Sequence, residues 1–149
     1  MEQLLAMEKG EARTALYRRI SAEMMYYFLT DSGSGGETRP PDWLLRVLNE
    51  MAKPENFTLG LPRLIEIANY SQEYINREFR RHLGTTPTRY INELRLRYAY
   101  ELLSVTDIAI VEVCEQSGFH NLSHFYTCFL HYFDTSPAKL RKALAVTSK

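Results

Sequence analysis

Thr86–Leu103, TPTRYINELRLRYAYELL, is the stretch that decides the fold. Thr86 is a favourable N-cap, and Pro87 suits the first helical position, where its missing N–H costs nothing. Apolar side chains recur at helical spacing with no Gly or Pro between them, namely Tyr90, Ile91, Leu94, Tyr98, Ala99 and Leu102. The pattern predicts one long helix, which at about 1.5 Å per residue spans roughly 26 Å.

This helix lies between two copies of one short pattern. Phe79–Pro87 and Phe129–Pro137 are offset by fifty residues, with an aromatic residue, a turn, a Ser or Thr cap and a Pro in register. Each copy predicts a short apolar helix, a tight turn and a second capped helix, which is a helix-turn-helix. Gly118 and Asn69 fall in the two turns and suit a backbone with positive φ. The linker helix is long enough to hold two such units near one DNA turn apart, about 34 Å.

The composition is that of an ordinary globular protein. The 149 residues are 45% apolar, and Lys plus Arg equals Asp plus Glu at 18 each. A net charge near zero argues against indiscriminate nucleic-acid binding. No apolar run approaches a membrane span and no signal peptide begins the chain, so we expect a cytoplasmic protein with no membrane partner.

Further helices complete an all-α chain. Leu16, Ile20, Met24 and Phe28 predict a helix within residues 1–30, and DSGSGGE (31–37) reads as a flexible linker. That helix packs on the chain, pairs with a second copy in a homodimer, or ends a further domain; these alternatives stay open. Helices are also expected after Pro41 and from Pro137 to about Ala145. The predicted architecture is two helix-turn-helix subdomains joined by one long linker helix, with an extra N-terminal helical segment.

The second helix of each unit has an exposed face that could read DNA. In the first unit, Ile75 and Phe79 point inward and the opposite face carries Gln72, Glu73, Asn76, Arg77 and Arg80. In the second, Phe125 and Phe129 point inward and the opposite face carries Leu122, Ser123, Tyr126, Thr127 and Leu130. Arg can grip guanine bidentately, and Asn can do the same for adenine. A solvated polar face is the plain alternative, but the duplicated motif favours DNA.

These units carry a set of specific motifs: Ser71…Ile75…Arg77…Phe79, Gly84…Thr86-Pro87…Tyr90, Leu94-Arg95-Leu96…Ala99…Leu102-Leu103, Gly118-Phe119…Asn121…Ser123-His124-Phe125…Phe129, and Ser136-Pro137. With them, the stretch from about Phe57 to Arg141 resembles the DNA-binding domain of the AraC/XylS family of bacterial transcription regulators. The preceding RPPDWLLRVLNEM (39–51) and PENF (54–57) are similar to its sugar-operon branch, such as chitobiose- or cellobiose-type regulators.

The resemblance implies a sequence-specific DNA-binding regulator that places two recognition helices in successive major grooves and controls a carbohydrate-related operon. Its expected partners are double-stranded DNA and RNA polymerase; no cofactor is expected, and any effector would bind outside this chain. The implied organisation is an N-terminal segment (1–37) and a DNA-binding domain (38–149), with units at about 58–84 and 107–145 around the linker helix 86–103. The candidate DNA-binding residues are Gln72, Glu73, Asn76, Arg77, Arg80, Arg81, Arg95, Asn121, Leu122, Ser123 and Thr127.

The second unit departs from the family pattern. The family usually has Arg or Lys where Thr127, Leu130 and His131 stand, and no Lys or Arg occurs from Tyr98 to Ala138. The first unit and the start of the long helix instead hold Arg77, Arg80, Arg81, Arg89, Arg95 and Arg97. Because phosphate neutralisation supplies much of protein–DNA affinity, we expect the first unit to anchor. The second would add a weaker, partly apolar contact, such as Leu122 against a thymine methyl.

The sequence also contains residue types found in zinc sites and in enzymes. Cys114, His120, His124 and Cys128 are zinc-type residues, but Cys114 falls on the inward side of its helix, so no metal site is expected. No phosphate loop, nucleophile elbow or metalloprotease helix is present, and Glu66, Glu73, Glu78 and Glu112 are expected to be solvated, which argues against an enzyme. The runner-up is a helical protein-interaction module, which would not need Asn76, Arg77 and Arg80 on one face.

Overall fold

The computed structural model describes residues 39–147, and within that range it contains helices and no strand. The helices are α2 (Asp42–Met51), α3 (Pro54–Phe57), α4 (Leu61–Ala68), α5 (Gln72–Leu83), α6 (Pro87–Val105), α7 (Ile110–Gln116), α8 (Leu122–Phe133) and α9 (Pro137–Thr147). The all-α class is confirmed. The helix and linker expected in residues 1–37 lie outside the described part of the chain.

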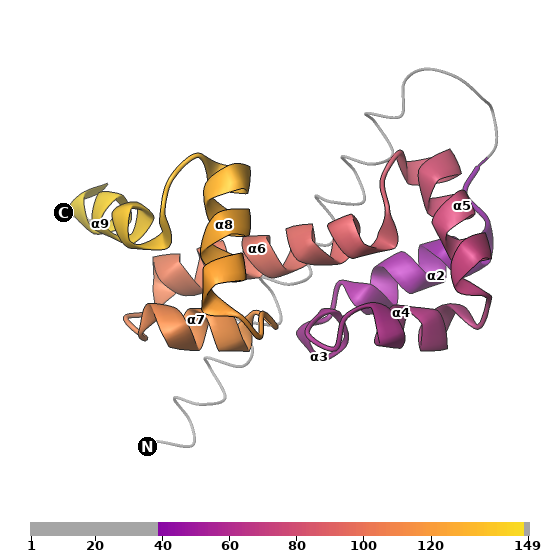
Figure 1. The fold of residues 1–149 in the computed structure, drawn as a ribbon, viewed down its shortest axis with the longest axis horizontal. Coiled ribbons are helices and arrows are strands. Elements are labelled where there is room, and N and C mark those ends of the chain that lie inside the picture. Colours follow the sequence, from indigo (N-terminus) through magenta and orange to yellow (C-terminus); the bar gives the residue numbers. More distant parts are fainter. Residues whose placement is uncertain (1–38, 148–149) are drawn as a thin grey trace.

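The molecule has two lobes that share one helix. Figure 1 shows α2–α5 in one lobe and α7–α9 in the other, with α6 running through both. In the same view α4 and α7 lie along the lower edge, and α5 and α8 rise from their ends in the same direction. The two helix-turn-helix units therefore have the same orientation along α6.

Side-chain caps start the three long helices of these units. Thr86 Oγ1 accepts a hydrogen bond from the Arg89 N–H at 3.3 Å, and α6 then runs to Val105, two residues beyond the predicted end. Ser71 caps α5 in the same way, and Asn121 caps α8. Each cap satisfies one of the N–H groups that the first turn of a helix leaves without a partner.

Residues with a left-handed backbone conformation end helices at corresponding positions of the two units. The turns after α4 and α7 contain Asn69 (φ 57°) and Gly118 (φ 91°), as their sequence predicted. The ends of α5 and α8 contain a further pair, Gly84 (φ 63°) and Asp134 (φ 54°), at the fifty-residue offset of the repeat. The internal repeat is therefore a repeat of backbone conformation as well as of side-chain type.

α6 is buried along most of its length because it contributes to the core of both lobes. It packs on α3, α4 and α5 on one side of its midpoint and on α7, α8 and α9 on the other. Its Tyr90 donates a hydrogen bond to the Leu48 carbonyl of α2 at 3.4 Å. In the second lobe, Phe125 and Phe129 are fully buried, with ring centroids 5.5 Å apart. Burying a side chain of this size stabilises the fold by roughly 1.5–3 kcal/mol.

Over residues 39–147, none of the helices is both long and apolar enough to cross a membrane.

Two glycines with positive φ allow a matched test of the packing. At Gly84 an added Cβ meets nothing within 4 Å, so Gly84→Ala should cost only the left-handed backbone, roughly 1–2 kcal/mol. At Gly118 the same atom would lie 2.8 Å from the Thr58 Cα, so Gly118→Ala should cost roughly 2–5 kcal/mol. Urea unfolding of the two variants measures the difference. Equal losses would contradict a tight contact at Gly118.

Candidate nucleic-acid interface

The candidate reading surface of the first unit is one face of α5. Ile75 and Phe79 have no exposed surface and fix the inner face of the helix in the core. The structure places the predicted residues together on the opposite side: Gln72, Glu73, Arg77, Arg80 and Arg81 are exposed and Asn76 is half-buried. This arrangement gives α5 three exposed arginines, a half-buried Asn, and a first turn that exposes one carboxamide and one carboxylate.

Arg77 is held in place within this face. Its guanidinium carbon lies 4.9 Å from the Tyr74 ring centroid, and its Nε lies 3.4 Å from Glu78 Oε1. The side chain nevertheless remains 68% exposed. A guanidinium stacked on a ring and paired at Nε presents its remaining N–H groups in a restricted direction, which suits bidentate recognition of a base.

Glu78 corrects an expectation from the sequence. It was expected to be solvated, but its side chain is only 9% exposed and its Oε2 lies 3.3 Å from His82 Nε2. His82 follows at i+4, so the two side chains share one face of α5. Buried carboxylates need partners, and here His82 and Arg77 supply them.

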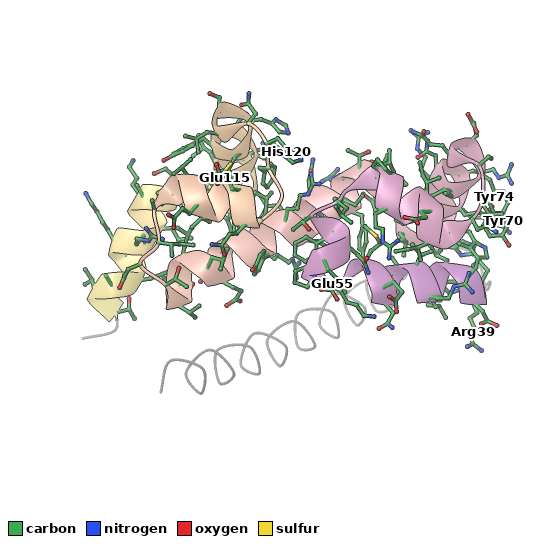
Figure 2. All side chains as sticks on the ribbon, turned by 90° about the horizontal axis from the view of Figure 1, so that it is seen from below. Arg39, Glu55, Tyr70, Tyr74, Glu115 and His120 are labelled. Carbon is green, nitrogen blue, oxygen red and sulfur yellow. The ribbon has the colours of Figure 1, made fainter. Side chains whose placement is uncertain are left out.

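Tyr74 also belongs to an aromatic cluster at the outer end of the first lobe. The Tyr74 ring centroid lies 5.7 Å from that of Trp43 and 4.9 Å from that of Tyr70. The ring centroids of Trp43 and Tyr70 lie 4.9 Å apart. Figure 2 shows Tyr70 and Tyr74 together at that end of the molecule. The cluster joins α2 to the start of α5 and so supports the ring on which Arg77 stacks.

The candidate surface of the second unit is different in character. Phe125 and Phe129 anchor α8, and its outer face exposes Asn121, Leu122, Ser123, Thr127 and Leu130. Leu122 and Leu130 are 42% and 53% exposed. Asn121 is occupied as the cap, accepting from the His124 N–H at 2.8 Å, and the Thr127 hydroxyl donates to the Ser123 carbonyl at 3.0 Å. Small polar and apolar contacts, rather than cations, are what this face can offer a base pair.

The two candidate reading helices differ in charge, because α5 exposes three arginines and α8 contains no Lys or Arg. From Tyr98 to Ala138 the chain has no Lys or Arg, and its acidic residues are Glu101, Asp107, Glu112, Glu115 and Asp134. Figure 2 shows Glu115 and His120 close together in the second lobe. Arg97 of the linker helix reaches α8, where its Nε donates to the Tyr132 hydroxyl at 3.1 Å. Sequence position alone had grouped Arg97 with the first unit.

Arg95, a candidate DNA contact from the sequence, bonds to backbone carbonyls between the two units. Its Nε donates to the Phe57 carbonyl at 3.0 Å and its Nη2 to the Thr58 carbonyl at 3.1 Å. Its guanidinium carbon is 5.8 Å from the Phe119 ring centroid in the second unit. Burial lowers the pKa of Arg95. This arginine therefore joins the two units, a role that no local pattern in the sequence signalled.

The zinc-type residues do not converge. Within the described residues, no group of three or more His, Cys, Asp or Glu side chains is placed to hold a metal ion. Cys114 is buried with its Sγ 3.6 Å from the Phe119 carbonyl, and burial raises the pKa of its thiol. Cys128 Sγ lies 3.5 Å from His124 Nε2 on α8, one helical turn away.

A family model described as a helix-turn-helix domain matches residues 64–143, which is more than half of the chain. The chain belongs to the AraC/XylS family of bacterial transcription regulators. It is 35% identical over 77 residues to the HTH-type transcriptional activator RhaS of Enterobacter sp. (strain 638), covering 52% of this chain and 28% of that protein. It is 38% identical over 68 residues to RhaS of Salmonella arizonae, covering 46% and 24%. The chain thus spans about a quarter of the length of these AraC/XylS relatives.

Solved AraC/XylS structures share the fold. An AraC-type transcriptional regulator from Chromobacterium violaceum matches with a TM-score of 0.61 and 28% identity, over 69% of this chain and 92% of that one. The C-terminal domain of AraT from Geobacillus stearothermophilus matches with a TM-score of 0.63 and 26% identity, over 71% and 88%. The DNA-binding domain of AdpA, solved in complex with a target DNA, matches with a TM-score of 0.64 and 24% identity, over 72% and 96%.

The stacking of Arg77 on Tyr74 can be tested by a double-mutant cycle. Tyr74→Phe keeps the ring and should leave DNA affinity unchanged, whereas Tyr74→Leu should weaken it about two- to fivefold, since an exposed cation–π contact contributes about 0.5–1 kcal/mol. In an Arg77→Ala background the Leu substitution should have no further effect. Fluorescence anisotropy on one duplex measures all four affinities. An undiminished effect of Tyr74→Leu without Arg77 would show that Tyr74 acts through another group.

Proposed function

We propose that this chain is the DNA-binding part of a transcription regulator and places α5 and α8 in successive major grooves of one duplex. The observation that carries the proposal is that the capped helices α5 and α8 rise in the same direction from the ends of α4 and α7 (Figure 1) and that each has an exposed face. Two recognition helices with one orientation match the repeat of the groove once per DNA turn, about 34–36 Å.

Roles within the surface follow from residue chemistry. Arg77 and Asn76 suit direct reading of guanine and adenine, while Gln72 and Glu73 lie in the first turn of α5, where recognition helices meet base edges. Arg80 and Arg81 lie further along α5 and suit phosphate contacts, which position the protein without specifying sequence. In the second unit, Ser123 and Thr127 suit small polar contacts and Leu122 suits a thymine methyl.

The two units should contribute unequally. The exposed face of α5 has three arginines, whereas the chain has no Lys or Arg from Tyr98 to Ala138 and carries five acidic residues over that stretch. Since neutralised phosphates provide much of the affinity, the first unit would anchor the complex. The second unit would then add sequence discrimination more than binding strength.

The regulatory role is proposed from the relatives. RhaS is named a transcriptional activator, which supports activation of transcription, with RNA polymerase as the second partner. The similarity of residues 39–57 to sugar-operon regulators supports a carbohydrate-related operon as the target. An effector, if one is used, would bind outside this chain, and a homodimer would form through the N-terminal segment or a further domain. No catalytic activity and no cofactor are part of the proposal.

The first test is selection of bound duplexes from a degenerate pool, followed by anisotropy titrations at two salt concentrations. The proposal expects a site with two separated blocks, about two turns long, and a salt slope that reflects its phosphate contacts. A single enriched block would mean that the second unit only supports the fold. Absence of binding at low salt would favour the protein-interaction module instead.

The unequal contribution has its own test on the selected site. Arg77→Ala should weaken binding by about 1–3 kcal/mol and relax the preference at one base pair. Arg77→Lys keeps the charge but loses the planar fork, so it should recover affinity more than specificity. The double variant Ser123→Ala/Thr127→Ala should lose less than Arg77→Ala. Equal losses from the two units would contradict the proposed asymmetry.

A further inference from the structure

The two units meet at a small junction beside the middle of α6. We define the junction as Arg95, the Phe57–Thr58 carbonyl pair, Gly118 and Phe119. Thr58 and the end of α3 belong to the first lobe, and Gly118 and Phe119 belong to the turn between α7 and α8 in the second. Figure 1 shows α3 and the α7–α8 turn facing each other at the centre of the molecule.

Arg95 fills the junction from the linker helix. It donates to two successive carbonyls at the end of α3, at 3.0 and 3.1 Å, and lies against the Phe119 ring. The last carbonyls of a helix have no partner within it and carry partial negative charge. A planar guanidinium bridging both of them has a defined orientation, because its donors are fixed in one plane.

Close backbone approach leaves the junction little freedom to shift. A Cβ at Gly118 would lie 2.8 Å from the Thr58 Cα, 3.0 Å from Arg95 Nε and 3.1 Å from the Thr58 carbonyl oxygen. A Cβ at Gly60 would lie 2.8 Å from Arg95 Nη2. Gly118 is therefore required by packing against the Thr58 backbone as well as by its positive φ of 91°, whereas Gly60, with a φ of 79°, faces the movable end of the Arg95 side chain. The two lobes touch directly, and the arginine fixes that contact to α6.

We propose that this junction sets the number of base pairs that the protein accepts between the two blocks of its DNA site, with Arg95 as the positioning residue. This inference rests on the proposed function. α6 joins the two lobes as one helix without an internal Gly or Pro. The junction prevents the lobes from rocking about that helix and so fixes the distance and angle between α5 and α8.

If the junction holds the two lobes rigidly, a DNA site with the wrong number of base pairs between its two blocks cannot be contacted by both recognition helices. Adding one base pair moves the second block by about 3.4 Å along the duplex and by roughly 35° around it, since one turn holds 10–10.5 base pairs. A helix seated in the major groove cannot follow both movements unless its lobe rotates relative to the other. With the junction intact, the second unit should lose its base contacts, each worth about 1–3 kcal/mol.

The test compares spacing profiles rather than single affinities. Duplexes carry the selected site with its two blocks separated by one base pair fewer, the native number, one more and two more. For the full chain, a change of one base pair should raise the Kd about tenfold or more. For Arg95→Met, which fills similar space without donors, the native site should bind within a few-fold and the penalty for one base pair should fall to about two- to threefold.

Matched variants separate positioning from charge and from folding. Arg89→Met removes an exposed arginine of α6 that pairs with Glu93 at 3.4 Å, and it should leave the spacing penalty unchanged. Arg95→Lys keeps the cation but not the fork, so it should have an intermediate penalty and remains informative if Arg95→Met fails to fold. The inference would be overturned if both Arg95 variants lost the same affinity at every spacing, so that a change of one base pair still raised the Kd as much as in the wild type.

The wild-type profile separates this inference from the proposed function. If the chain binds a two-block site but tolerates every spacing equally, the junction does not set the spacing, while the proposed function stands. If no two-block site is selected at all, the proposed function itself fails.

Discussion

The bridge from Arg95 to the carbonyls of Phe57 and Thr58 is the interaction on which the arrangement of the two lobes depends. It is a partly buried cation, and removing it from water is favourable only because neutral acceptors and an aromatic ring replace the lost hydration. α3, whose last carbonyls it binds, is only four residues long. Arg95 thus serves as a C-terminal cap supplied by a different helix.

The same connection explains why glycines stand at both sides of the junction. Gly60 precedes α4 and Gly118 precedes α8, and each leaves room that a Cβ would occupy. Gly118 is constrained in two ways: its φ is positive, and the nearby Thr58 backbone leaves no room for a Cβ. The first unit therefore contacts the second through the segment before α4 and the turn between α7 and α8, while the outer faces of α5 and α8 stay exposed.

The two units share a backbone but differ in surface chemistry. On α5 a buried carboxylate and an aromatic ring hold Arg77, so cationic groups are present and oriented. On α8 the exposed residues are apolar or small, and the linker helix supplies Arg97 to Tyr132. Two units with the same fold but different surfaces can divide the work, so that one supplies most of the DNA affinity and the other discriminates between base sequences. The connection through α6 then matters, because the weaker unit reaches its groove only if the stronger one positions it.

Local features of the sequence predicted most of the fold. The caps Ser71, Thr86 and Asn121 and the turn residues Asn69 and Gly118 act on their own neighbours, so residue type and spacing were sufficient. The inward positions of α5 and α8 followed from helical periodicity for the same reason. The predicted end of α6 was two residues short, and the four-residue helix α3 was not predicted.

Contacts between distant segments were not predictable in this way. Arg95 looked like one more arginine of a basic stretch, and nothing in its neighbours indicates that it meets carbonyls 37 and 38 residues earlier in the chain. Glu78 looked solvated because its pairing with His82 depends on both side chains turning inward. Gly118 was expected for its φ, but its contact with Thr58 depends on how the two lobes pack.

The central claim is that α5 and α8 are held in one fixed relation before DNA is bound. The most direct measurement is a distance distribution by double electron–electron resonance, with spin labels at Arg81→Cys and His131→Cys and with Cys114 and Cys128 replaced by Ala. These label positions are exposed and equivalent in the two units. A fixed relation between the two helices should give one narrow distance distribution that is the same with and without DNA. A broad or two-peaked distribution in the free protein, narrowing only on DNA, would contradict it.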